Sequence, residues 1–303
     1  MDHGTSADRA LAAIDVGTNT IRLLVARVDD RGLTPLARGS ALIGLGAGLG
    51  ADRTIPQERL DLAEETVGRM AEEAWGLGAG EISVACTAVG RDAANAGELL
   101  ARIERATGAT PRVVTGDQEA ELTFRGLVAS GALHGAVGGP LLACDLGGGS
   151  LELMGGEGGR LEWSASLPVG TRRVSEAFRP GDPPSLDLVD AMVAAAAASV
   201  ENVAALHRGA TTGVASGGSA VALTVLCRTD RLDGPALLAA IERIAGAPAA
   251  DIAEETGLEE ERVRLSFAGA AVLEAVRRAF DLDALVVSEA GLREGLLLEM
   301  AMR

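Results

Sequence analysis

Short apolar runs alternate along the chain with longer stretches in which apolar residues recur at helical spacing. Residues 81–86, 112–114 and 285–287 are apolar or alternating runs typical of strands. Residues 56–75 begin with proline and carry apolar residues at the spacing of one helix face. Further helices are expected at residues 116–130, 185–207, 220–227, 235–244 and 267–280. Strands that alternate with helices predict an α/β fold.

Two segments repeat the same order of residue types. Residues 12–25 and 141–153 each contain a strand that ends at an aspartate, then an apolar residue, a glycine, a small polar turn and a second strand. The two aspartates, Asp15 and Asp145, lie 130 positions apart. Because repetition of a supersecondary unit is a fold-level signal, we expect two similar domains that face one cleft. This layout resembles the actin-like ATPase architecture, with its ribonuclease H-like domains.

The turn after Asp145 is glycine-rich, with three successive glycines at 147–149 followed by Ser150. Glycines allow neighbouring backbone N–H groups to converge on an anion, as a phosphate site requires. Asp145 and Glu152 flank the turn, and Mg²⁺ prefers such carboxylate oxygens. The alternative is an ordinary glycine-rich hairpin with solvated carboxylates, and the repetition of the pattern favours the phosphate site.

Three further segments are candidates for contacts with an anion. Arg91 follows a strand at the head of a helix, where it can reach a phosphate or pair with Asp92 or another neighbour. Glu119 lies in the first turn of a helix, where acidic residues commonly cap the helix and complement its dipole. A glutamate that projects from there into a cleft can instead orient a water. Residues 213–219 form a third glycine turn before a helix N-terminus, whose N–H groups can bind anions.

The length of 303 residues gives room for two domains of about 150 residues each. Residues 129–140 are glycine-rich and lack strong periodicity, so we expect the domain boundary and a hinge there. We therefore assign residues 1–128 to the first domain and 129–303 to the second. The C-terminal helix, about 291–303, can pack back on the first domain.

The charge balance limits the partners of the protein. A net charge of −16 disfavours nucleic acid, because duplex binding depends on a basic surface. All 27 basic residues are arginine, so an anion must be held by guanidinium groups or backbone N–H groups. The three cysteines lack CxxC spacing and are expected to be buried thiols. With a polar start and no uninterrupted apolar run of about 18 residues, we expect a cytoplasmic protein that does not enter membranes.

With these segments in place, the sequence resembles the short form of the exopolyphosphatase and guanosine pentaphosphate phosphohydrolase (Ppx/GppA) family. The matching segments, in order, are IDVGTNTIRLLVA, TAVGRDAAN, GDQEAEL, DLGGGSLEL, SLPVGTRRVSE, SGGS and SEAGLREGLL. The resemblance covers nearly the whole chain and implies a hydrolase that acts on phosphoanhydride bonds. We expect release of terminal phosphate from inorganic polyphosphate, with short chains preferred, or from a phosphorylated guanosine nucleotide such as pppGpp.

The resemblance also implies roles for individual residues. Glu119 would orient or deprotonate the attacking water, and Arg91 would clamp the phosphate charge. Asp145 and Glu152 would hold Mg²⁺, with Mn²⁺ as an alternative. The residues implied in phosphate binding are Asp15, Gly17, Thr18, Asn19, Gly147, Gly148, Gly149, Ser150, Gly217, Gly218 and Ser219. A homodimer is expected from the resemblance alone.

Three positions depart from the pattern of the family. Gly44 stands where many members have arginine, Arg264 where they have aspartate, and Ala290 where they have an acidic residue or histidine. These changes and the acidic charge argue against a long polyphosphate. The rival hypothesis is a non-catalytic sensor that binds polyphosphate or an alarmone. The intact carboxylates favour the enzyme, because a pure binder needs neither a metal nor a water-orienting group.

Overall fold

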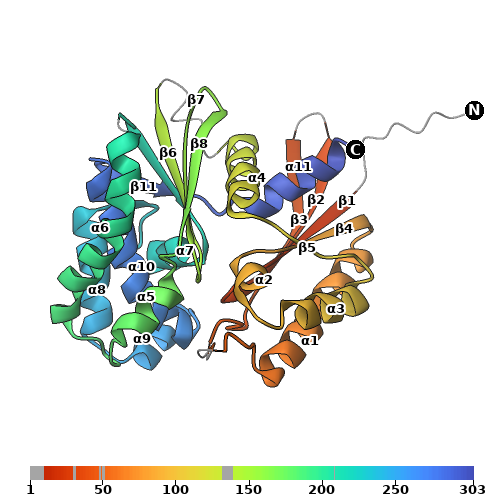
Figure 1. Ribbon diagram of the computed structural model, residues 1–303, viewed down its shortest axis with the longest axis horizontal. Helices are drawn as coiled ribbons and strands as arrows, with labels where there is room; N and C mark the ends of the chain where they lie inside the picture. Colours follow the sequence, from red (N-terminus) through yellow and green to blue (C-terminus); the bar gives the residue numbers. More distant parts are fainter. Residues whose placement is uncertain (1–9, 30–31, 48, 50–51, 132–138, 208) are drawn as a thin grey trace, which may run out of the picture. The chain divides into compact units, whose positions relative to one another are not determined.

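The computed structural model describes residues 10–29, 32–47, 49, 52–131, 139–207 and 209–303 (Figure 1). Its contacts divide the chain into two compact units. Unit 1 combines Met1–Gly131 with Ala290–Arg303, and unit 2 is Ala132–Glu289. Residues 132–138 of the expected hinge lie outside the described residues.

Unit 1 is built on a five-stranded sheet with the strand order β3-β2-β1-β4-β5. The β1–β2 and β2–β3 pairs are antiparallel, whereas β1–β4 and β4–β5 are parallel. The elements are β1 (Ala10–Val16), β2 (Thr20–Asp29), β3 (Gly32–Leu42), α1 (Gln57–Gly76), β4 (Ala79–Cys86), α2 (Ala88–Asp92), α3 (Ala96–Thr107), β5 (Arg112–Val113), α4 (Gly116–Ala129) and α11 (Leu292–Ala301).

Helices cover both faces of the sheet of unit 1 (Figure 1). On one face Ile14 packs with Leu60 of α1 and Leu99 of α3. On the other face Leu24 packs with Leu122 of α4 and Leu296 of α11. A strand covered on both faces is apolar throughout, which explains why β1 is a continuous apolar run before its aspartate.

Backbone contact joins α4 and α11. A Cβ atom added at Gly126 would lie 2.0 Å from the carbonyl oxygen of Gly291, and one at Gly295 would lie 1.9 Å from that of Leu122. The start of α11 is held further by Glu294, whose Oε1 accepts from Arg38 Nη1 at 2.8 Å. Only glycine allows the two helices to approach this closely.

Unit 2 contains a six-stranded sheet with the order β10-β11-β9-β6-β7-β8. The β6–β7 and β7–β8 pairs are antiparallel, and β6–β9 and β9–β11 are parallel. The elements are β6 (Leu141–Leu146), β7 (Leu151–Glu157), β8 (Arg160–Leu167), α5 (Thr171–Phe178), the 3₁₀ helix η2 (Leu186–Leu188), α6 (Val189–Leu206), β9 (Thr212–Ser216), α7 (Gly218–Cys227), β10 (Arg231–Asp233), α8 (Gly234–Ala245), α9 (Ala249–Thr256), α10 (Glu260–Ala279) and β11 (Ala284–Val287).

The long helix α10 lies at the centre of the helical layer of unit 2, buried from Val263 to Val276 at most positions. The sequence predicted that this helix starts at residue 267, and that prediction was wrong because it begins at Glu260. The acidic segment 259–261 is its N-terminal turn, where negative side chains complement the helix dipole. The short elements α9 and β10 were not expected, because segments of so few residues show little periodicity.

The predicted repeat is present in both sheets. Each sheet contains a hairpin whose first strand also pairs in parallel with a later strand: β1 with β4, and β6 with β9. Asp15 pairs with Arg22 across the first hairpin, and Asp145 pairs with Glu152 across the second. The predicted α/β class is confirmed, with one mixed sheet in each unit and the repeated hairpin in both sheets.

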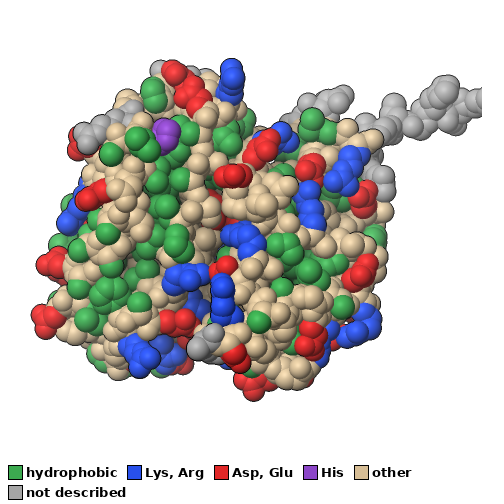
Figure 2. Space-filling model, viewed as in Figure 1, with side chains coloured by type: hydrophobic (Ala, Val, Ile, Leu, Met, Phe, Trp, Pro, Cys, Tyr) green, Lys and Arg blue, Asp and Glu red, His purple; other side chains and the backbone are tan. Residues whose placement is uncertain are grey.

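The apolar segment Leu186–Leu206, with a mean hydropathy of 1.4, is long and apolar enough to cross a membrane by length and composition. One side of α6 nevertheless packs into unit 2, through Met192, Val200 and other residues of the core. The opposite side is mostly alanine, and Leu206 at its end is 80% exposed. Figure 2 shows apolar side chains among charged ones over the helices of unit 2. We therefore assign α6 as a core helix of a globular unit.

Candidate functional site

The first hairpin turn is held by a neighbouring loop. Gly17 N–H donates to Thr20 O at 3.1 Å and closes the turn. Asn19 O accepts from the N–H groups of Ile43 and Gly44, and Thr18 O accepts from that of Gly46, all at 2.8 Å. In a trans peptide the next N–H points away from the carbonyl, so those of Asn19 and Thr20 point away from this loop. The hydroxyl oxygen of Thr18 is buried and has no hydrogen-bond partner among the described residues.

Gly44 is one of the three positions that depart from the family pattern. Its φ of +66° lies in the left-handed region, where a side chain is unfavourable. Its N–H also holds the turn through Asn19 O. The loop at residues 43–46 therefore supports the first phosphate-binding candidate.

The second hairpin turn is held in the same way by the N-terminus of α5. Gly147 N–H donates to Ser150 O at 3.0 Å, as Gly17 N–H donates to Thr20 O. Gly147 O accepts from Thr171 N–H at 3.0 Å, and Gly148 O accepts from Arg172 N–H at 2.9 Å. The N–H groups of Gly148 and Gly149 consequently point away from α5. Within the described chain neither donates to a backbone carbonyl, so this turn can bind an anion.

Two carboxylates lie side by side at the base of the second turn. Asp145 and Glu152 are directly paired across β6 and β7, so their side chains share one face of the sheet. Glu152 is 1% exposed and accepts from Ser166 Oγ at 2.9 Å. A Cβ atom on Gly217 would lie 2.8 Å from Asp145 Oδ1, so the third glycine turn lies beside this carboxylate.

The carboxylate pair fits a divalent metal. The described residues contain no group of three or more His, Cys, Asp and Glu that could hold an ion by themselves. Mg²⁺ does not need one, because it commonly uses one or two carboxylates together with waters and phosphate oxygens. Asp145 and Glu152 supply this minimal set of hard oxygen ligands on one sheet face.

The third glycine turn begins helix α7. Gly217 is its N-cap with a φ of +99°, and the helix continues from Gly218. Ser219 Oγ donates to Thr171 Oγ1 at 3.4 Å, so α7 also contacts the first residue of α5. The predicted residues of unit 2 therefore gather at one edge of its sheet, because the parallel strands β6 and β9 both end there.

Glu119 and Arg91, which were predicted separately, form an ion pair in unit 1. Arg91 Nη1 donates to Glu119 Oε2 at 2.8 Å and also to Val114 O at 2.8 Å. The side chain of Glu119 is 8% exposed. The helix is capped by Thr115 and Gln118, so capping does not explain Glu119. Arg91 thus fixes the direction of a buried carboxylate that can accept a hydrogen bond from water.

Asp92 was the other partner expected for Arg91. Asp92 forms an ion pair with Arg53 at 3.3 Å, and Arg91 forms one with Glu119 at 2.8 Å. Asp15 lies near the end of β1, the turn 17–19 follows β1, and Arg91 and Glu119 follow β4 and β5. Because these strands are parallel, the residues lie at one edge of the sheet of unit 1.

Sequence reasoning missed several residues of these sites. Arg22 shares a sheet face with Asp15 and takes the position that Glu152 holds in the repeat. Gly170 is the N-cap of α5, and a Cβ atom there would lie 2.4 Å from both C and O of Gly148. Aligning the two repeats in the sequence could have identified Arg22, because it takes the position of Glu152. Gly170 could have been identified as a glycine directly before a predicted helix.

The cysteines take no part in this chemistry. Cys86 and Cys144 are buried free thiols, as expected, whereas Cys227 is half-buried. Burial, together with the charge of Asp15, raises the pKa of Cys86 to about 12. Burial raises the pKa of Cys144 still further. Both remain neutral thiols at physiological pH and are poor metal ligands.

Comparison with known proteins identifies the family. The model of the Ppx/GppA phosphatase family matches residues 24–303. The chain belongs to the Ppx/GppA phosphatase family. It is 30% identical over 309 residues to exopolyphosphatase 1 of Mycobacterium tuberculosis, covering 95% of this chain and 87% of the relative. The match to exopolyphosphatase 1 of Mycobacterium leprae is 31% over 311 residues, with coverages of 95% and 88%.

Solved structures agree on the fold of this Ppx/GppA protein. An exopolyphosphatase from Cytophaga hutchinsonii superposes with a TM-score of 0.85 at 24% identity, over 97% of this chain and 98% of the other. At that identity the superposition shows the fold alone. The sequence relatives make the chain a homologue of exopolyphosphatases, which hydrolyse phosphoanhydride bonds. The family typically uses a divalent metal.

Proposed function

We propose that this Ppx/GppA phosphohydrolase releases terminal phosphate from short-chain inorganic polyphosphate by metal-assisted attack of water. The observation that carries the proposal is the orientation of the second glycine turn. The first turn of α5 binds the carbonyl groups of Gly147 and Gly148, so the following N–H groups are presented for an anion. Asp145 and Glu152 lie beside that turn, where phosphate oxygens would complete the coordination of Mg²⁺.

Roles in the reaction are assigned to residues of each unit separately. When bound, Mg²⁺ or Mn²⁺ would neutralise phosphate oxygens and act as a Lewis acid. Glu119 accepts a hydrogen bond from the attacking water and takes its proton, with Arg91 holding the carboxylate in one orientation. In each unit the N–H groups of the hairpin turn are the donors that would bind phosphate oxygens and stabilise negative charge on them. Positioning and charge stabilisation supply most of the catalysis of phosphoryl transfer.

The charge of the chain supports a short substrate. With a net charge of −16 and no lysine, most of the surface would repel a long polyanion. A short polyphosphate would contact only the backbone N–H groups of the turns. It would therefore not extend over the acidic surface that repels a longer chain. Three free cysteines support a reducing compartment, and we propose a cytoplasmic location.

Phosphate release by the purified protein tests the proposal. The panel is tripolyphosphate, long-chain polyphosphate, pppGpp and ATP, each with Mg²⁺, with Mn²⁺ and with a chelator. We expect the highest kcat/KM on tripolyphosphate with Mg²⁺ and loss of turnover with the chelator. If kcat/KM were highest on pppGpp, the proposed substrate would be wrong, but the proposed class of reaction would stand. If no compound were hydrolysed but one bound with micromolar affinity, the result would contradict the proposed enzyme and support a non-catalytic sensor.

Gly170→Ala is expected to raise the KM for tripolyphosphate at least about tenfold. The added methyl group would lie 2.4 Å from the backbone of Gly148, and a backbone atom cannot rotate away, so the turn must shift. Steady-state kinetics measure the effect. Gly97→Ala is the control, because a Cβ atom there has nothing within 4 Å. An unchanged KM in Gly170→Ala would show that the turn does not bind the substrate.

A further inference from the structure

The second glycine turn has a third carbonyl group on the same side as the other two. Gly147 O and Gly148 O accept from the backbone of α5, and Gly149 O accepts from the side chain of Arg173, whose Nε lies 3.1 Å away. Arg173 N–H also donates to Gly148 O at 3.3 Å. Three successive carbonyls are therefore bound from one side by the first three residues of one helix.

The third hydrogen bond extends the anion site by one donor. Since Gly149 O points towards Arg173, the N–H of Ser150 points away from it. This N–H joins those of Gly148 and Gly149, and among the described residues none of the three donates to a backbone carbonyl. Without Arg173 the carbonyl group of the peptide between Gly149 and Ser150 would lose this hydrogen bond, which helps to fix the direction of the peptide. Glycine at 149 offers no steric restraint in its place.

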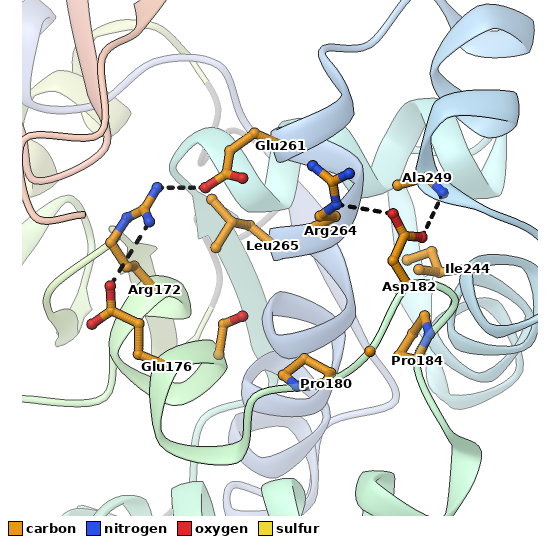
Figure 3. Close-up of a pocket in the computed structure, with 12 residues that line it drawn as sticks. Arg172, Glu176, Pro180, Asp182, Pro184, Ile244, Ala249, Glu261, Arg264 and Leu265 are labelled. Atoms are coloured by element: carbon orange, nitrogen blue, oxygen red, sulfur yellow. Dashed lines mark hydrogen bonds and ion pairs between the residues drawn. The ribbon is translucent and has the colours of Figure 1, made fainter. Parts of the chain in front are cut away.

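Helix α5 is itself linked to α10 by an ion pair. Arg172 is 8% exposed and directs its side chain to α10, where Nη2 lies 2.7 Å from Glu261 Oε1 (Figure 3). It also pairs with Glu176 at 3.8 Å. A cavity of about 100 Å³ next to this pair is bordered by a second ion pair, between Arg264 and Asp182, at 3.0 Å. Both arginines that border the cavity are paired with carboxylates. The pair Arg172–Glu261 joins α5 to α10, and the pair Asp182–Arg264 joins the loop after α5 to α10.

We propose that Arg173 is a positioning residue of the phosphate site, which acts through its hydrogen bond to Gly149 O and not through its charge. This inference rests on the proposed function for the identity of the ligand. The geometry of the turn itself does not depend on it. The chemical class that the turn selects is a terminal phosphate group, whose oxygens the aligned N–H groups of residues 148–150 accommodate.

Three substitutions separate positioning from charge. Arg173→Gln keeps an N–H donor and loses the charge, Arg173→Met loses both, and Arg173→Lys keeps both. We expect Arg173→Met to raise the KM for tripolyphosphate about tenfold with kcat within about threefold of wild type. Arg173→Gln and Arg173→Lys should stay within about threefold in both constants. Arg179→Met is the matched control, since Arg179 lies at the opposite end of α5 and is exposed.

A second readout needs no turnover. In ¹H–¹⁵N spectra of the ligand-free protein, the amide signals of Gly148, Gly149 and Ser150 should shift in Arg173→Met and stay near their wild-type positions in Arg173→Gln. Unchanged signals in Arg173→Met would overturn the inference, even if the wild-type enzyme proved inactive on every substrate. So would a KM that rises equally in the Met and Gln variants but not in Arg173→Lys, because charge would then be the requirement.

Discussion

Glu119→Gln is expected to release phosphate at least about 100-fold more slowly than wild type, with the KM for tripolyphosphate changed less than about threefold. Glutamine keeps the size of the side chain and an oxygen that can accept from Arg91 Nη1, now 2.8 Å from the carboxylate. It cannot take a proton from water. The loss should therefore appear in kcat, which single-turnover and steady-state assays measure.

Glu121→Gln is the matched control for this variant. Glu121 lies two residues further along α4, is half-exposed, and pairs with Arg125 on the surface of the same helix. An exposed pair of this kind contributes little to stability, so both kcat and the melting temperature should be unchanged. If Glu119→Gln melted like wild type and kept its kcat, Glu119 would not act on the water.

Gly295→Ala is expected to lower the free energy of unfolding by about 3 kcal/mol or more. The new methyl group would lie 1.9 Å from Leu122 O, within the backbone of α4. Neither helix can relieve this overlap by a side-chain rotation, so α11 must separate from α4. Because α4 carries Glu119, phosphate release should fall as well.

Urea denaturation followed by circular dichroism measures the stability of the Gly295→Ala variant. Gly97→Ala provides the comparison, because its methyl group meets no atom within 4 Å and alanine favours the helix. We expect Gly97→Ala to be as stable as wild type or slightly more stable. Equal stability of the two variants would show that close contact between α4 and α11 is not required.

Much of the architecture could be predicted from local patterns. The apolar run before Asp145, the glycines after it and the alternation up to Glu152 predict a hairpin, which the antiparallel pairing of β6 and β7 confirms. The repetition at Asp15 predicts the second unit of the same topology. These features depend on residues close in sequence, whose spacing alone decides between strand, turn and helix.

Family membership and the class of reaction were also open to prediction, because the motifs occur in a fixed order along the chain. Both are confirmed by the family match over residues 24–303. The roles of Glu119, Asp145 and Glu152 remain predictions, and the structure adds that two of them are paired across one hairpin.

By itself, then, the sequence determined the two hairpins, the α/β alternation and the family of the protein. Only the tertiary structure decided which groups donate hydrogen bonds to the carbonyls of the turns. These are the loop that binds Asn19 O, the N-terminus of α5 that binds Gly148 O, and the Arg173 side chain that binds Gly149 O. It alone paired Arg91 with Glu119, 28 residues apart. The physical reason is that these hydrogen bonds join segments distant in sequence, and their partners are set by packing of the sheets and helices. Local periodicity carries no information about such partners.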